Sequence, residues 1–165
     1  MANNKDVEVI SAPNMLQIKV GGPISQGDLH LIQKAEEAMK DLRSDFGQWL
    51  EEEVVKLEAA AKVVRGTGLK GDEGEQLFVC AHDLRGLGAT YEFPIITRLA
   101  KSLTKMIDMP EKRAVAPTAL ALAHVGAIRA ALSQNIRDDN DPVAAALAGE
   151  LETQTATFAE PWKDD

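Results

Sequence analysis

Residues 77–91 read LFVCAHDLRGLGATY, a proline-free stretch in which apolar residues recur every three or four positions. This spacing predicts an α-helix. A helical wheel gathers its core-facing residues on one side: Leu77, Cys80, Ala81, Leu84, Gly88 and Tyr91. His82 points about 140° away from Leu77 at 100° per residue. We therefore expect the imidazole of His82 at the surface of a helical protein.

The surface predicted around His82 is unusual for a solvated helix face, which normally carries Glu, Lys and Gln. Its neighbours at helical spacing are Phe78, Val79, Arg85, Gly86 and Ala89. A glycine inside a helix costs about 1 kcal/mol relative to alanine. Gly86 lies one turn after His82, where a missing side chain gives a bulky group access to the ring. The apolar residues indicate a protein-docking surface, and Arg85 can pair with an anion.

Similar periodicity along the chain predicts an all-α protein. We expect helices over residues 29–64, 72–91, 94–107, 114–136 and 143–158. The first has one apolar stripe that comprises Ile32, Ala35, Met39, Leu42, Phe46, Trp49 and Leu57. Short links favour antiparallel neighbours, so the predicted architecture is an up-down antiparallel four-helix bundle with an N-terminal arm and an extra C-terminal helix. The predicted divisions are an irregular arm (1–27), the bundle (28–136) and an acidic helix and tail (137–165).

Composition excludes several classes of function. The formal net charge is −8, and no basic excess suggests nucleic-acid binding. No stretch approaches ~20 consecutive apolar residues, and the N-terminus lacks a secretion pattern. A single cysteine allows no internal disulfide, which fits a cytoplasmic protein. Residues 137–165 hold eight acidic and two basic residues, which we interpret as a solvated acidic tail.

We do not expect the other histidines or the cysteine to form a functional site. His30 is expected to be an unremarkable surface histidine. His124, on the flank of an apolar helix, is expected to be packed and hydrogen-bonded. Cys80 and His82 point about 160° apart on a helix, and no second Cys/His cluster follows. We therefore expect no metal site.

The segment Ala81-His82-Asp83-Leu84-Arg85-Gly86, followed by small residues, resembles the A-H-x-L-[K/R]-G signature of histidine-containing phosphotransfer (HPt) domains. The resemblance covers about residues 29–136. It departs at the next turn, where Phe93-Pro94 replaces the common Gly-Ala. The family's fold is a four-helix bundle that exposes a phosphorylatable histidine midway along one helix.

The resemblance implies a phosphorelay intermediate without kinase activity of its own. His82 would accept a phosphoryl group from a receiver-domain aspartate and pass it to another. Arg85 would stabilise the phosphate, Gly86 would give access, and the docking floor would comprise Phe78, Val79 and Ala89. The implied partners are response-regulator receiver domains, of a hybrid histidine kinase and a downstream regulator. Mg²⁺ would belong to the receiver, so no cofactor is expected here, and we expect a monomer.

Three basic residues of the next helix leave two interpretations open. Arg98, Lys101 and Lys105 lie opposite its leucines. They form either a solvated basic face or a contact with the acidic rim of a receiver domain.

Two further functions remain as alternatives. One is a helical adaptor that binds receivers without being phosphorylated, although the intact Arg85-Gly86 pair argues against it. The other is the dimerisation and phosphoacceptor fragment of a histidine kinase. A complete kinase also needs an ATP-binding domain, for which the predicted helices leave no room. No Ser-His-Asp or paired-carboxylate arrangement suggests a hydrolase.

Overall fold

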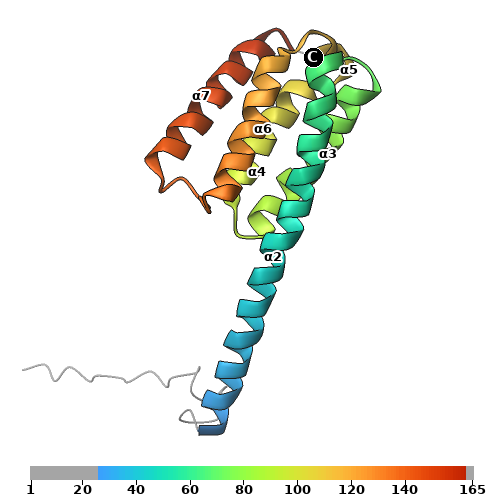
Figure 1. The fold of residues 1–165 in the computed structure, drawn as a ribbon. Coiled ribbons are helices and arrows are strands. Elements are labelled where there is room, and N and C mark those ends of the chain that lie inside the picture. Colours follow the sequence, from blue (N-terminus) through green and yellow to red (C-terminus); the bar gives the residue numbers. More distant parts are fainter. Residues whose placement is uncertain (1–25, 163–165) are drawn as a thin grey trace, which may run out of the picture. The chain divides into compact units, whose positions relative to one another are not determined.

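The computed structural model describes residues 26–162, which contain α-helices and no strand (Figure 1). The elements are α2 (Gln26–Thr67), α3 (Asp72–Thr90), α4 (Pro94–Ile107), α5 (Pro110–Val115), α6 (Thr118–Ser133), α7 (Pro142–Ala159) and the 3₁₀ turn η1 (Glu160–Trp162). The all-α prediction is confirmed for these residues. The predicted arm lies outside them, apart from Gln26 and Gly27, which begin α2.

The chain divides into two units, one ending at Asp41 and the other beginning at Leu42. In the first unit, the described residues are the N-terminal part of α2, and their apolar side chains Leu29, Leu31, Ile32 and Met39 are exposed. In the second unit, α2 buries Leu50, Val54, Leu57, Ala60, Ala61 and Val64. Of the predicted apolar stripe, Leu57 is buried in this core, and Phe46 and Trp49 contact the ring of Tyr91, with centroids 5.1 and 6.0 Å apart.

The turn between α3 and α4 brings these two helices close together. Glu92 adopts φ 64°, and Pro94 occupies the first turn of α4, where its missing N–H costs nothing. Gly88 permits the close approach, since a Cβ there would lie 2.7 Å from Thr97 Oγ1 and 2.8 Å from Thr97 N. Both helix boundaries agree closely with the sequence prediction.

Helix α4 packs against α3, α5, α6 and α7, and this contact network forms a bundle-like core. Ile96, Ala100, Leu103, Met106 and Ile107 of α4 are completely buried. Arg129 of α6 attaches that helix to α2, because its guanidinium donates to Glu51 and Glu58 at 2.6–2.9 Å.

The single helix predicted over residues 114–136 is wrong. The chain forms the short helix α5, then an extended residue at Ala116 (φ −65°, ψ 138°), and then α6 from Thr118. Pro117 disfavours the helical conformation in the residue before it, and this effect outweighs the helix propensity of the flanking alanines. Helix α4 ends at Ile107, as predicted.

The acidic C-terminal segment is only partly a solvated tail. Helix α7 packs on α4 and α6, and the side chain of Asp141 caps it by accepting from Val143 N and Ala144 N. Arg98 of α4 binds Glu152 through Nε and Nη2 at 2.8 and 2.7 Å, and Asp139 at 2.7 Å. Asp139 and Glu152 are therefore paired with Arg98, while their side chains remain 59% and 41% exposed.

The described helices do not combine the length and apolar character needed to cross a bilayer.

Candidate functional site

Helix α3 presents His82 to solvent, as the helical wheel predicts. Its side chain is 60% exposed, while Ala81 and Leu84, on either side in the sequence, are completely buried. The core face therefore fixes the rotation of α3, and that rotation directs the imidazole outward. The nearest carboxylate oxygen recorded for His82 belongs to Asp83, 4.0 Å from Nδ1.

A shallow cleft of about 420 Å³ begins at His82 and extends across to α4. Its lining residues are Phe78, His82, Arg85, Lys101, Thr104, Lys105 and Asp108. The phenyl ring of Phe78 forms one wall, with its centroid 5.9 Å from that of the imidazole and the planes tilted by 44°. Phe78 also packs against the core, so this wall is anchored.

The cleft concentrates positive charge beside the imidazole. Arg85 comes from α3, and Lys101 and Lys105 come from α4. The carboxylate in the cleft, Asp108, pairs with Lys112 at 2.9 Å, so another cation balances its charge. An anionic group attached to His82 would therefore meet a cationic environment, which favours a phosphoryl group electrostatically.

The three basic residues that the sequence predicts on one face of α4 do not all line the cleft. Lys101 and Lys105 line it, whereas Arg98 is bound to Glu152 and Asp139. These two carboxylates raise the pKa of Arg98 above its ordinary value. Arg98 therefore contributes to the packing of α7 and is not among the residues that line the His82 cleft.

The remaining predicted site residues lie outside the cleft lining. Val79, Gly86 and Ala89 are exposed on α3 but are not among the cleft residues. At Gly86, a Cβ would meet nothing within 4 Å, so space is open there. Two cleft residues, Thr104 and Asp108, were missed. Each follows a lysine of the same helix by three residues, Thr104 after Lys101 and Asp108 after Lys105, and this spacing was the available signal.

His124 is a packed and hydrogen-bonded histidine, as predicted. It is completely buried, its Nδ1 donates to Leu120 O at 2.8 Å, and Ser102 Oγ donates to its Nε2 at 2.9 Å. Thr155 Oγ1 lies 3.1 Å from Ser102 Oγ. Burial lowers the pKa of His124 below 6.5. In this tautomer both nitrogens of the neutral ring have hydrogen-bond partners. His124 therefore serves packing.

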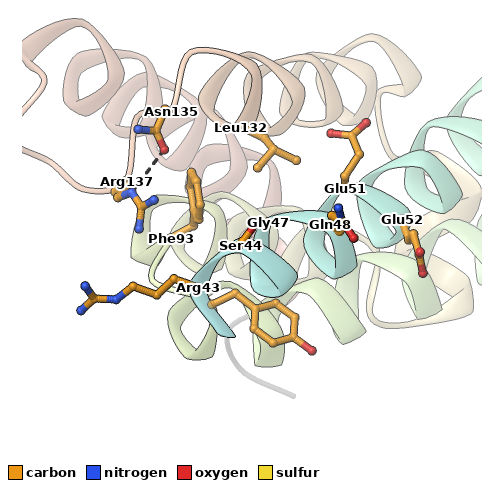
Figure 2. A pocket seen from close by; sticks show the side chains of 11 residues that line it. Arg43, Ser44, Gly47, Gln48, Glu51, Glu52, Phe93, Leu132, Asn135 and Arg137 are labelled. Atoms are coloured by element: carbon orange, nitrogen blue, oxygen red, sulfur yellow. Dashed lines mark hydrogen bonds between the residues drawn. The ribbon is translucent and has the colours of Figure 1, made fainter. Parts of the chain in front are cut away.

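Another hollow, of about 630 Å³, lies away from the predicted site residues and is lined by parts of α2, the α3–α4 turn and the segment after α6 (Figure 2). Arg137 reaches it and binds Asn135 Oδ1 at 3.2 Å. Arg43 and Arg137 both pair with Glu92 at 3.0 Å. Because one carboxylate is shared between the two arginines and Glu51 and Glu52 also line the hollow, it lacks a strong excess of either charge.

Comparisons with protein-family models, curated proteins and solved structures gave no match. The functional assignment therefore depends on the chain's own residues.

Proposed function

We propose that the protein is a phosphocarrier, a class of protein that holds a phosphoryl group covalently between two partners. More specifically, we propose a histidine phosphotransfer protein of a two-component phosphorelay. One observation carries the proposal: the exposed imidazole of His82 shares a cleft with Arg85, Lys101 and Lys105. The Ala81–Gly86 motif independently identifies the same histidine.

The proposed architecture is an up-down antiparallel four-helix bundle of α2, α3, α4 and α6, with α7 as an extra C-terminal helix. The contacts of α4 with both α3 and α6 support it, as do the ion pairs of Arg129 with Glu51 and Glu58. Short connections between successive helices also favour antiparallel neighbours.

In the proposed reaction, Nε2 of neutral His82 attacks the phosphorus of a receiver's aspartyl phosphate. The new N–P bond forms as the P–O bond to aspartate breaks, and the free carboxylate leaves with the bonding electrons. The proton stays on Nδ1, the nitrogen near Asp83. Imidazole suits this role because its neutral form presents a nucleophilic ring nitrogen. The reverse reaction delivers the phosphoryl group to a second receiver aspartate.

The proposed partners are receiver domains of a hybrid histidine kinase and of a downstream regulator in the cytoplasm. Arg85 would stabilise the phosphoryl oxygens. Lys101 and Lys105 would meet the acidic rim around the receiver's aspartate, and Phe78 would supply an apolar contact. Mg²⁺ would be held by the receiver, so the carrier needs no cofactor.

The test is a phosphoryl-transfer assay against the receiver domains of the source organism. Each receiver domain is first phosphorylated with radiolabelled acetyl phosphate. Label should move to the protein, be labile to acid and stable to alkali, and disappear in His82→Ala. His30→Ala is the matched control and should label normally. Binding without transfer would support the adaptor, and labelling by ATP and Mg²⁺ alone would support the kinase fragment. Either result would overturn the proposal.

A further inference from the structure

Arg113 of α5 is a charged residue in an interior position. Only 7% of its side chain is exposed, and it is not among the residues that line the His82 cleft. A buried guanidinium is stable only where its N–H donors have partners. Here Nη1 donates to Ile107 O at 3.0 Å and to Asp108 O at 3.5 Å, and Nη2 lies 3.8 Å from Glu75 Oε2.

The C-terminal end of α4 explains why a cation is held at this position. The last carbonyl groups of a helix lack partners within the helix and carry partial negative charge. Arg113 donates to the carbonyls of Ile107, the last residue of α4, and of Asp108, which follows it. Because both acceptors belong to the backbone, these bonds fix the position of the guanidinium.

The fixed guanidinium lies against the aromatic wall of the His82 cleft. Its central carbon is 5.7 Å from the centroid of the Phe78 ring, within the distance of about 6 Å at which a cation is attracted to an aromatic ring. The centroid of the same ring lies 5.9 Å from that of the His82 imidazole. Phe78 is only partly buried. Core packing therefore contacts only part of the ring, and Arg113 constrains it further.

We propose that Arg113 is a positioning residue, which holds the ring of Phe78 in place beside His82. Through this contact, the short helix α5 determines the shape of a cleft that α3 and α4 form. The placement of Phe78 is independent of any reaction at His82. Its consequence for phosphoryl transfer rests on the proposed function: a receiver domain would meet an apolar contact that is already ordered, which favours binding.

The first experiment measures the placement of Phe78 by NMR, through the nuclear Overhauser effect (NOE) between the ring protons of Phe78 and those of His82. The wild type should show this NOE, and its loss in Phe78→Leu identifies the signal. Arg113→Met should weaken it by about twofold or more, because a cation–aromatic contact shifts side-chain populations by about that factor.

Arg129→Met is the matched control. Arg129 is also a partly buried arginine that pairs with two carboxylates, but it is not among the cleft residues. Its removal should leave the NOE at the wild-type intensity. An absent NOE in the wild type, an unchanged NOE in Arg113→Met, or equal weakening in both variants would overturn the proposal, since equal weakening would show a general loosening of the fold.

Circular dichroism checks that each variant is folded. If Arg113→Met does not fold, Arg113→Gln takes its place. The glutamine amide keeps an N–H donor for the carbonyl of Ile107 but carries no cation to attract the ring of Phe78. The same weakening of the NOE is expected from this variant, and an unchanged NOE would overturn the proposal equally.

The second experiment measures phosphoryl transfer from a receiver domain. Arg113→Met should raise KM by about two- to tenfold, because one more side chain must then be ordered on binding. The value of kcat should stay close to the wild type, since His82 and Arg85 are unchanged. In a Phe78→Leu protein the same substitution should not raise KM further, because Arg113 acts through that ring.

The two experiments separate failure of this proposal from failure of the proposed function. An equal rise of KM in the wild-type and Phe78→Leu backgrounds would overturn the action of Arg113 through Phe78. If the wild-type protein accepts no phosphoryl group from any receiver domain, the proposed function fails. The NOE measurement then still decides whether Arg113 holds Phe78 beside His82.

Discussion

The backbone N–H of Ala89 donates a hydrogen bond to Oγ1 of Thr97 at 2.7 Å. This bond joins the C-terminal end of α3 to the first turn of α4, next to the glycine that allows their close approach. The helix that carries His82 is therefore fixed directly to the helix that carries Lys101 and Lys105.

Two neighbouring glycines of α3 should respond oppositely to alanine. Gly88→Ala should destabilise the protein by about 1–3 kcal/mol, because its Cβ would collide with Thr97. Gly86→Ala should stabilise it by up to about 1 kcal/mol, since a Cβ there meets open space. Urea denaturation followed by circular dichroism measures both changes. Equal midpoints for the two variants would contradict the packing described at Gly88.

Gly86→Gln separates access from stability. We expect this variant to be at least as stable as the wild type, because glutamine has the higher helix propensity. Phosphoryl transfer from a receiver should be at least tenfold slower, because the new side chain would fill space one turn from His82. A transfer time course and a melting curve on the same sample provide the readouts. Transfer at the wild-type rate would show that Gly86 does not provide access.

The basic side of the cleft should determine how fast a receiver docks. Lys101→Glu combined with Lys105→Glu should lower kcat/KM for transfer at least tenfold, and the difference should shrink as salt screens the charges. The matched control is Lys62→Glu, an exposed lysine of α2 outside the cleft lining. If the control slows transfer equally, net charge rather than the cleft governs docking.

Arg98→Ala should loosen α7 without direct loss of a cleft residue. It removes the paired bonds to Glu152 and the bond to Asp139, and we expect a loss of about 1–2 kcal/mol because these charge-assisted bonds are only partly exposed. Hydrogen exchange measured by mass spectrometry should accelerate in residues 142–159 more than in α3. Uniform acceleration would indicate global destabilisation instead.

His124 should make stability depend on pH. Burial lowers its pKa in the folded protein, so unfolding takes up a proton below the ordinary pKa of about 6.5. Stability is therefore complete above that pH and declines as the pH falls toward the lowered folded-state pKa. His124→Gln should flatten this part of the curve, while His30→Gln, at an exposed position, should retain it. Urea midpoints between pH 7 and 5 provide the measurement.

Sequence periodicity was sufficient to predict local helical structure. It was insufficient to predict contacts between residues that are far apart in the sequence. The bounds of α3 and α4 and the outward direction of His82 followed from spacing and from Pro94. The break before α6 was missed because helix-favouring alanines surround Pro117. The partners of Arg98 could not be predicted, since Glu152 is 54 positions away. The tight contact at Gly88 likewise depends on how two helices approach, which a single-helix pattern does not contain.

The buried contacts of His124 have a consequence for the uniqueness of the helix packing. Ser102, His124 and Thr155 come from α4, α6 and α7, and their buried side chains meet where these three helices pack together. Leucine and alanine contacts tolerate sliding, because one apolar group can replace another. A slide of α7 or α6 by one turn would leave hydroxyl or imidazole groups buried without partners, at about 1–3 kcal/mol each. These three polar residues therefore disfavour packings in which α6 or α7 is shifted along its axis.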